Sequence, residues 1–455
     1  MVLAVCALSL DAAATQINPS SQTPASSQVN RTPVLKPWAR TYGTASPYEG
    51  IFDMRRASSG SIQVAGYGSS PGNVDAAGLL MTLSAGDGSV RSQNLVVNTF
   101  GGTVDGAGLA ADGGALFTGR IVEDIYTKHD AWVVRVDSQG TPLWQRGFTV
   151  PGIGRFLILD AVELNSGAWI IAGATSVTDQ PPQAAYIVRL SATGNVDWQY
   201  EYLGGLTEHV QSITSTSDGG FAIAGWTTSS GAGMEDALVM KLDSSGAIQW
   251  QTTFGGSDCD QANWIIELTG GGFAVAARTC SFTSSGNAPW VVRLDAQGNQ
   301  LWHQVADGVW GDLYSIAETS GGGVVALGRV GEAGFPSNDL WALELGPSGN
   351  PLWQRAYEGD SGDWGSCVLA LPGSSCLLGG VWGWGFPEDD LFVVRTAADG
   401  KLPHCDLDRR TSFSLISPHL VWQAGVATRA PGVATNRAFA FSSFVGSAGV
   451  AERCR

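Results

Sequence analysis

The sequence is poor in charge, and the excess that it has is acidic. Only 15% of the 455 residues are charged, with 25 Lys and Arg against 41 Asp and Glu, and no basic run occurs. The formal net charge of −16 argues against a nucleic-acid or anionic-membrane partner, because both are polyanions. No apolar run approaches the roughly 20 residues that a membrane-spanning helix needs, so we expect no transmembrane segment.

Motifs that carry catalysis or bind metals are also missing. The chain has no CxxC pair or Cys/His cluster, and its single G-x-S-x-G, at residues 68–72, is not in a strand-to-helix context. The five His are scattered without metal or triad spacing: His129, His209, His303, His404 and His419. We therefore predict no catalytic residue, no metal site of this kind and no cofactor from motifs.

What the chain does have is internal repetition. A marker Trp recurs at steps of 51 to 54 residues, each time after an apolar run and a glycine turn such as DALVMKLDSSGAIQW. Its positions are Trp144, Trp198, Trp250, Trp302 and Trp353. A second glycine turn between apolar runs, such as STSDGGFAIAGWT, raises the number of recognisable copies to seven. A period near 50 residues predicts a propeller or a solenoid.

Each copy contains four short runs rich in Val, Ile, Leu and aromatic residues, which predicts a four-stranded antiparallel meander. Both faces of such a sheet are apolar, so each sheet must be covered on both sides by its neighbours. We therefore predict an all-β, seven-bladed β-propeller. The marker Trp is interpreted as an anchor between blades. A basic position on the third strand, as at Arg135 and Lys241, is assigned to inter-blade ion pairing or to edge solvation.

The ring is predicted to close with a strand from the N-terminus. The seventh copy, DLFVVRTAADGKLPHCDLD, has no Trp after its glycine turn, whereas KPWARTYG near the start matches the missing strand, LWQRAYEG. Trp38 should therefore complete the blade that residues 360–400 begin. Such a non-local pair would lock the ring at seven blades.

The termini differ in composition from the repeats. Residues 1–15 hold an apolar run followed by small residues, which is typical of a signal peptide, although a basic start is missing. Residues 16–34, rich in Ser, Thr, Gln, Asn and Pro, are interpreted as a flexible linker to a propeller at 35–405. Residues 406–455 are expected to form a tail of two or three strands packed on the ring. We expect an extracytoplasmic protein, either secreted, periplasmic or at a cell surface.

The cysteines fit an oxidising compartment. Removal of Cys6 with the signal peptide leaves an even number, which we pair by position in the repeats as Cys259 with Cys280, Cys367 with Cys376, and Cys405 with Cys454. The first two pairs flank equivalent hairpins, and the third would tie down the tail. Six buried free thiols are the alternative.

The unit D-A-W-V-V-R-L-D-x-x-G-x-x-x-W-x-x-x-F-G-G, followed by D-G-G-F-x-I-A-G-W-T, resembles the bacterial extracytoplasmic seven-bladed β-propeller repeats known as SBBP. The resemblance covers about residues 35–405 and implies a fold but no single activity. A more distant similarity is to pyrroloquinoline-quinone-type propellers. That family has eight blades, a motif one residue longer and usually an adjacent cysteine pair, none of which is found in this sequence.

The candidate site lies on one face of the predicted ring. The loops between the second and third strands and between blades converge there and carry tryptophans outside the anchoring position: Trp226, Trp310, Trp364, Trp382 and Trp384. The same loops carry many acidic residues: Glu208, Glu235, Asp258, Asp260, Asp312, Asp339, Asp360, Asp363, Asp389 and Asp390. Aromatic and acidic residues on one rim can bind sugars or calcium. The alternative is that the tryptophans fill gaps and the acids are solvated.

The sequence therefore predicts an exported, monomeric binding or interaction module whose partner is a protein or a glycan. Two alternatives remain open. One is an enzyme on the same face, either a glycan lyase or hydrolase or a quinone-dependent oxidoreductase. The other is a purely structural repeat protein.

Overall fold

The structure is a computed structural model that describes most of the chain from residue 36 onward. The described ranges are 36–43, 49–69, 76–98, 102–124, 128–149, 155–176, 183–331, 338–357, 362–384 and 390–402, followed by strands at 408–410, 414–416, 421–424, 428–431, 435–437, 441–445 and 449–452. All regular elements in these ranges are β-strands. None of these residues belongs to a helix that is long and apolar enough to cross a membrane.

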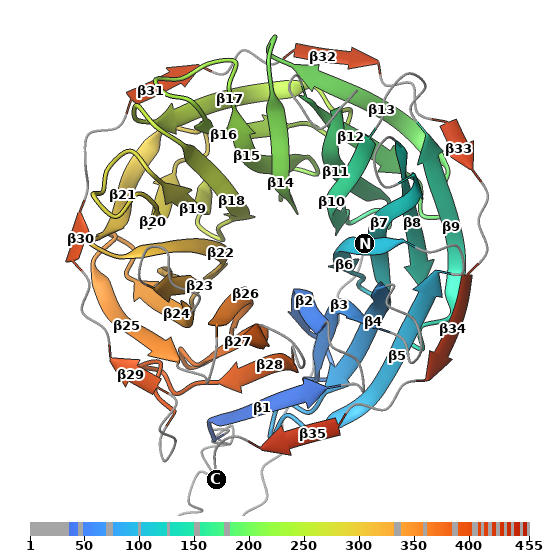
Figure 1. The fold of residues 1–455 in the computed structure, drawn as a ribbon, viewed down its shortest axis with the longest axis horizontal. Helices are drawn as coiled ribbons and strands as arrows, with labels where there is room; N and C mark the ends of the chain where they lie inside the picture. Colours follow the sequence, from blue (N-terminus) through green and yellow to red (C-terminus); the bar gives the residue numbers. More distant parts are fainter. Residues whose placement is uncertain are drawn as a thin grey trace, which may run out of the picture. The chain divides into compact units, whose positions relative to one another are not determined.

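Seven antiparallel blades form a ring, which confirms the predicted all-β, seven-bladed propeller (Figure 1). Strands within a blade follow each other from the centre outward. Blades 1 to 3 are β2(Glu49–Arg56), β3(Ile62–Ser69), β4(Ala76–Leu83), β5(Val90–Asn98); β6(Thr103–Leu109), β7(Ala115–Asp124), β8(Lys128–Val136), β9(Pro142–Thr149); and β10(Arg155–Glu163), β11(Trp169–Ser176), β12(Gln183–Leu190), β13(Val196–Leu203). Blades 4 and 5 are β14(Glu208–Ser215), β15(Phe221–Thr227), β16(Asp236–Leu242), β17(Ile248–Gly255); and β18(Asp260–Glu267), β19(Phe273–Thr279), β20(Ala288–Leu294), β21(Gln300–Asp307). Blade 6 is β22(Trp310–Glu318), β23(Val324–Gly331), β24(Asn338–Leu345), β25(Pro351–Tyr357), and blade 7 is β26(Gly362–Ala370), β27(Cys376–Trp384), β28(Asp390–Arg395) with β1(Trp38–Gly43).

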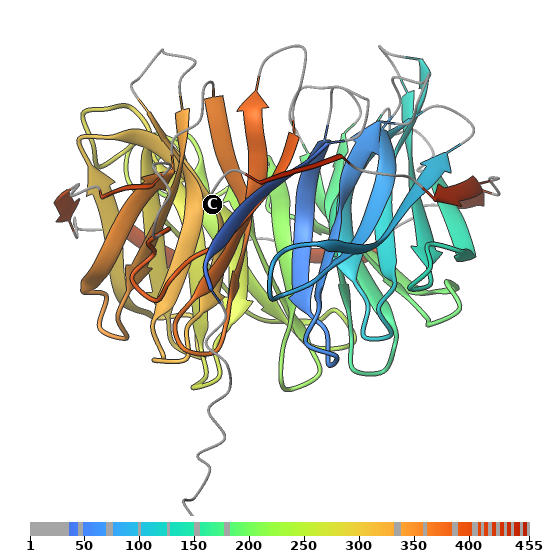
Figure 2. The same cartoon turned by 90° about the horizontal axis from the view of Figure 1, so that it is seen from below.

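The ring has two different faces, seen edge-on in Figure 2. We call the turn face the one that carries the first-to-second and third-to-fourth turns, as at 216–220 and 243–247 in blade 4. The loop face carries the second-to-third and blade-to-blade connections, as at 228–235 and 256–259. The turns are tight because a glycine adopts the left-handed conformation that side chains disfavour, for example Gly219 with φ of 83°.

The repeated tryptophans anchor neighbouring blades, as predicted. Trp250 of blade 4 donates its indole N–H to the carbonyl of Ala296 in the third-to-fourth turn of blade 5, at 3.0 Å. Its ring lies against Gly298, where a Cβ would come within 2.7 Å of the indole. Trp144 and Trp302 repeat the arrangement, whereas Trp353 donates to Glu344 of its own blade. The period of the sequence is therefore the period of the blade contacts.

The basic position on the third strand has two roles: Arg189 and Arg395 donate to carbonyls of the next blade, those of Ser244 and Ala85, whereas three other copies act within their own blade. Lys241 pairs with Asp218 at 2.8 Å, and Arg135 pairs with Asp112 at 2.6 Å, and both acids lie in the first turn of the same blade. Arg293 donates to the carbonyl of Gly271 in the equivalent turn. In these three copies the cation thus reaches along its own sheet and holds the first turn. Inter-blade ion pairing was the wrong expectation for these three residues.

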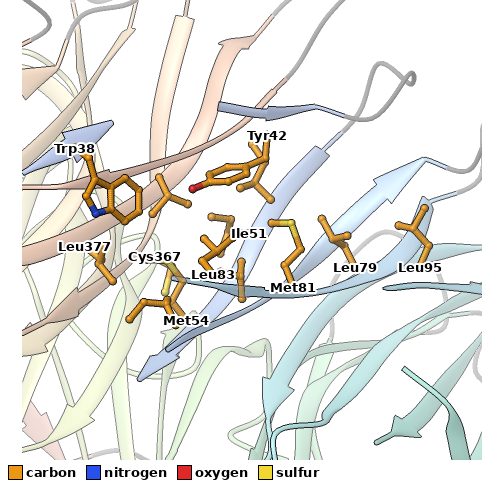
Figure 3. Packing of buried hydrophobic residues seen from close by; sticks show 14 of the residues in the cluster. Trp38, Tyr42, Ile51, Met54, Leu79, Met81, Leu83, Leu95, Cys367 and Leu377 are labelled. Carbon is orange, nitrogen blue, oxygen red and sulfur yellow. The ribbon is translucent and has the colours of Figure 1, made fainter. Parts of the chain in front are cut away.

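The N-terminal strand closes the ring, as predicted. Strand β1 pairs antiparallel with β28, and Trp38 registers with Arg395. Trp38 and Tyr42 then pack with Ile51, Met54 and other side chains of blade 1, and Figure 3 shows this cluster. The hydroxyl of Tyr42 donates to the carbonyl of Gly88 at 2.6 Å. Closure therefore relies on contacts with the third-to-fourth turn of the next blade, as the other junctions do. Here these contacts join β1, which completes blade 7, to blade 1.

The described residues of the tail form seven strands, where two or three were expected. They are β29(Asp408–Arg410), β30(Ser414–Ile416), β31(Val421–Ala424), β32(Thr428–Pro431), β33(Thr435–Arg437), β34(Phe441–Val445) and β35(Gly449–Glu452). Each pairs with the outer strand of one blade, and together they run around the circumference of the ring (Figure 1). Strands of three to five residues carry too short an alternation to be read from sequence.

Candidate functional site at the loop face

The five predicted tryptophans all lie at the loop-face ends of strands. Trp226 lies one residue before the end of β15, Trp310 begins β22, and Trp364 lies near the start of β26. Trp382 and Trp384 lie at the end of β27. The side chains of Trp364, Trp382 and Trp384 are outside the described residues. The role of this set as a ligand site therefore remains a prediction, and only Trp226 and Trp310 can be followed to their contacts.

Trp226 uses one face of its ring inside the protein. The imidazole of His209 lies parallel to it, with 5.1 Å between ring centroids and 8° between planes. Burial lowers the pKa of His209 to about 4, so the imidazole is neutral at pH 7. A neutral stacked pair of this kind fills the space between the first two strands of blade 4.

Trp310 belongs to a polar cluster in blade 6. The guanidinium of Arg329 lies 4.9 Å from the centre of the Trp310 ring and 5.6 Å from that of Tyr314. Asp312 accepts from Arg329 Nη2 at 2.9 Å and from the Tyr314 hydroxyl at 3.0 Å. Asn287 of blade 5 also donates to Asp312, at 2.7 Å. Asp312 thus fixes the orientation of Tyr314 and Arg329.

The acidic residues of this face cap its loops. Asp260 accepts from the backbone N–H of Gly256 at 2.7 Å and from the Ser281 hydroxyl at 2.7 Å. Asp236 accepts from Ala232 N and Gly233 N, both at 3.1 Å. These carboxylate oxygens accept hydrogen bonds from the loops themselves. The same oxygens are therefore not left open for a sugar hydroxyl or a calcium ion. Among the described residues, no group of three or more His, Cys, Asp or Glu side chains is placed to hold a metal ion.

An apolar cavity of about 300 Å³ lies near the centre of this face, where blades 6, 7 and 1 meet. Its lining residues are Gly50, Ile51, Phe52, Tyr67, Tyr314, Ser366 and Val381. The rings of Phe52 and Tyr67 are 5.2 Å apart and tilted by 41°. The cavity is of the size and character that holds one large apolar group, with few polar groups to orient it.

Three of the lining residues are placed by β-bulges. In β2, β22 and β26 the register with the next strand shifts by one residue, which leaves Phe52, Tyr314 and Ser366 as the extra residues. A bulge redirects a side chain out of the regular alternation, and bulges are common beside binding sites. The same shift occurs in the inner strand of every blade. The bulge alone therefore does not make the cavity, which depends on the residue types at the bulge positions of blades 1, 6 and 7.

The sequence analysis missed this cavity. In six of the seven copies a glycine follows the apolar run after the second glycine turn, as Gly225 does in STSDGGFAIAGWT. Tyr67 directly follows this glycine in its copy, just as Trp226 and Arg329 do in theirs. Comparison of this one position across the copies would have indicated Tyr67. Phe52 and Tyr314 had no such signal, because a bulge position cannot be distinguished from a regular strand position in the sequence.

A second cavity, of about 440 Å³, is lined by inner strands of all seven blades. Asp53 and Asp160 lie in its wall, and each joins its blade to the next by accepting a backbone N–H: Asp53 from Leu109 at 3.0 Å, and Asp160 from Ile213 at 2.9 Å. Burial raises the pKa of Asp160 to about 7, against the opposing effect of its two backbone hydrogen bonds. Each of these two carboxyl groups therefore holds its own blade to the next one.

One of the predicted disulfides is present and one is not. Cys259 and Cys280 are bonded across the hairpin on the loop face of blade 5. Cys367 and Cys376 are buried free thiols. Cys376 registers with Ala370, three residues from Cys367, so the two side chains project from opposite faces of the sheet. Equal distance from the turn centre was thus insufficient, because the register of this hairpin separates the two residues.

The third pair, Cys405 with Cys454, lies outside the described residues and stays a prediction. The nearest described residues on each side are close to the same strand. Leu402 packs in a buried cluster with Ala39, and Glu452 registers with Arg40. Peptide mapping of the non-reduced protein would reveal the linked pair, and recovery of both cysteines as free thiols from oxidised protein would contradict it.

Comparisons with known proteins add no function. No protein-family profile and no curated protein sequence matches the chain. Among solved structures, the chain is similar to a protein of unknown function from Dyadobacter fermentans, with 10% identity, a TM-score of 0.47 and coverage of 79% of this chain and 97% of that one. YCF48 bound to D1 peptide matches with 11% identity, a TM-score of 0.42 and coverage of 80% and 97%. A rhamnogalacturonan lyase from Bacillus licheniformis matches with 12% identity, a TM-score of 0.33 and coverage of 79% and 72%.

Proposed function

We propose that the protein is an extracytoplasmic interaction module that binds a protein partner at the loop face. The apolar cavity between blades 6, 7 and 1 carries the proposal. Its aromatic and aliphatic lining suits a large apolar side chain from a partner, whereas a sugar would require more polar groups than Ser366 and the tyrosine hydroxyls supply. The Cys259–Cys280 disulfide supports an oxidising compartment.

Exposed apolar side chains on the same face support a protein partner. Leu206 is 55% exposed and Met234 is 71% exposed, both in loops at the loop face of blade 4. Flexible apolar residues on loops suit adaptable contacts around a central anchor. Blade 4 lies across the ring from the cavity (Figure 1), so the partner would place one apolar side chain in the cavity and extend over the loop face to the loops of blade 4.

Selection of peptides from a random displayed library would test the proposal. The parent protein should enrich peptides with an aromatic or branched aliphatic anchor, and Ser366→Phe, which fills the cavity, should weaken their binding at least tenfold. Ser244→Phe makes the same change at an exposed position of the turn face and should leave binding unchanged. Tyr67→Ala, which removes one wall, serves as a second variant if Ser366→Phe does not fold.

Two results would overturn the proposal. One is enrichment of the same peptides by the parent and by both cavity variants, because binding would then occur elsewhere. The other is a glycan array on which the parent binds a defined glycan and loses that binding in Ser366→Phe, because the face would then recognise sugars.

A further inference from the structure

The tail is paired to the ring in reverse order of the blades. Strands β29 to β34 pair with the outer strands of blades 6, 5, 4, 3, 2 and 1 in turn, and β35 pairs with β1 in blade 7. All seven pairings are antiparallel. We call residues 408–452 the belt.

We propose that the belt keeps the propeller ring closed, a role that we call the lock. Within it, β35 pairs with β1 and holds that strand in place, and we call β35 the clasp. The weak point of the ring is β1, because among the described blade strands it alone is distant in sequence from the rest of its blade, β26 to β28. Without the belt, β1 would be an edge strand that pairs with β28 alone and can separate from its free end. With the belt, β1 lies between β28 and β35, so it must break two ladders to leave.

The registers show how far the clasp reaches. Residues 38–42 pair with 395–391 of β28, and residues 40–43 pair with 452–449 of β35. Three consecutive residues, Arg40 to Tyr42, are therefore paired on both sides. Central strands of this kind open less readily than edges, because opening exposes backbone groups on both sides at once.

The belt also tethers neighbouring blades. Consecutive belt strands are separated by only three or four residues, as between Val445 and Gly449 or between Ile416 and Val421. A connection of three residues spans at most about 14 Å when fully extended, at about 3.6 Å per residue step. Two blades therefore cannot move far apart unless a belt strand first leaves its sheet.

The belt has a further consequence for partners. The outer strand of a blade is otherwise an exposed edge, which another chain can extend by strand addition. Each outer strand in this ring is already paired with a strand of the belt. Partner strands are thereby excluded from the rim, which leaves the loop face for recognition.

Hydrogen exchange measured by mass spectrometry on two matched variants would test the lock. Val450→Pro with Ala451→Pro disrupts β35, and Ser442→Pro with Ser443→Pro disrupts β34 in the same way on blade 1. Two consecutive prolines are used because successive N–H groups point to opposite sides of a strand. One of the two substitutions therefore removes an N–H that faces the paired blade strand, β1 or β5. The β35 variant should speed exchange in residues 38–43 at least tenfold and raise the unfolding rate in denaturant, whereas the β34 variant should speed exchange only around 90–98.

Either of two outcomes would overturn the proposal. The first is unchanged exchange in β1 and an unchanged unfolding rate in the β35 variant. The second is an equal acceleration of unfolding by both variants, because the belt would then be a general cover without a clasp. If the variants do not fold, the parent alone decides: β1 must exchange as slowly as β28, and exchange at the rate of a frayed edge contradicts the lock.

Discussion

The turn face and the loop face are made from the same strands, yet they hold their acidic residues in opposite ways. On the turn face the pKa values of Asp112, Asp218 and Asp295 are lowered. On the loop face the pKa values of Asp236 and Asp260 are raised. These three turn-face carboxyl groups therefore favour the charged form, whereas Asp236 and Asp260 on the loop face disfavour it, as does Glu344 near the turn-face end of β24.

The physical cause is the balance of burial and hydrogen bonding. Burial is the largest single influence on Asp218 and acts to raise its pKa, but the hydrogen bonds from Lys241, Thr216 and Gly220 N, with the charge of Lys241, together outweigh it and hold the pKa at about 2. For Asp260, burial outweighs the hydrogen bonds from Thr279, Gly256 N and Ser281, and the nearby charge of Asp236 adds to the rise. Short turns leave their acids in water, whereas longer loops fold over theirs.

The comparison teaches that the tryptophan anchors between blades repeat at the turn face, whereas the side-chain contacts of the loops do not repeat. Turn-face contacts, such as those of Trp250 and Gly298, follow the sequence period and hold adjacent blades together. Loop-face contacts differ from blade to blade, with a stacked His209 in blade 4, a disulfide in blade 5 and an Arg–Asp–Tyr cluster in blade 6. Variation there is compatible with the fold, so a binding cavity can form at that face.

Replacement of one tryptophan on each face should give the largest difference. Trp250→Ala removes an inter-blade anchor and its hydrogen bond, and we expect a loss of about 3 kcal/mol in the free energy of unfolding. Trp226→Ala removes a half-buried ring that stacks on His209 and should cost less than half as much. Denaturant unfolding followed by circular dichroism would measure both, and equal losses would contradict the division between the faces.

Reduction of the loop-face disulfide should come next in size. The bond closes a loop with a sequence separation of 21, and its loss should lower the free energy of unfolding by about 2 to 3 kcal/mol. A reductant should thus lower the denaturant midpoint of the parent. Cys259→Ala with Cys280→Ala should already show that lower midpoint, and a further shift of the variant by the reductant would mean that another disulfide contributes.

Two glycine substitutions separate backbone strain from packing. Gly298 on the turn face has φ of 82° and Gly286 on the loop face has φ of 84°, so alanine at either position costs about 1 kcal/mol of strain. Only at Gly298 does the new methyl group meet a neighbour, the ring of Trp250. Gly298→Ala should therefore lower the free energy of unfolding by about 1 to 3 kcal/mol more than Gly286→Ala. Thermal or denaturant unfolding would measure the loss of stability in the two variants. Equal losses would contradict the prediction, because they would mean that the ring of Trp250 can shift away from the new methyl group without cost.

The pH dependence of stability should show both kinds of carboxyl group. The pKa of Asp160 in the folded protein, about 7, lies above its unfolded value, so its contribution to stability is greatest at low pH and falls as pH rises from about 4 to 7. The pKa of Asp218, about 2, lies below its unfolded value, so its contribution is present above about pH 4 and is lost as pH falls toward 2. Denaturant midpoints between pH 2 and 8 should fall at both ends of the range.

Substitution assigns each limb of that profile. Asp160→Asn should flatten the decline between pH 4 and 7, by about 1 kcal/mol or more across that range. Asp218→Asn should flatten the decline below pH 4 by a smaller amount, because its side chain is 48% exposed and its ion pair with Lys241 is screened by solvent. A profile that neither variant alters would show that other groups govern the acid and neutral limbs.

The sequence by itself determined the features that repeat. Seven copies with a fixed period predicted seven blades, the marker Trp predicted the inter-blade anchor, and the match of residues 36–43 to a missing strand predicted closure by β1. Such features can be read because each depends on local apolar alternation and on a contact that recurs once in every copy. The disulfide between Cys259 and Cys280 was predicted for the same reason, since the hairpin fixes which residues face each other.

Only the tertiary structure decided the features that occur once. The belt forms because its short strands complete sheet edges that exist only after the ring has closed. The bulge itself recurs in every blade, and the cavity forms only where blades 6, 7 and 1 meet and the bulge residues are Phe52, Tyr314 and Ser366. Cys367 and Cys376 are kept apart by a register that their spacing from the turn did not reveal. Edge pairing by the belt and the meeting of blades 6, 7 and 1 depend on contacts between distant segments, and the exact register of a hairpin depends on its packing in the sheet, so apolar alternation alone does not reveal them.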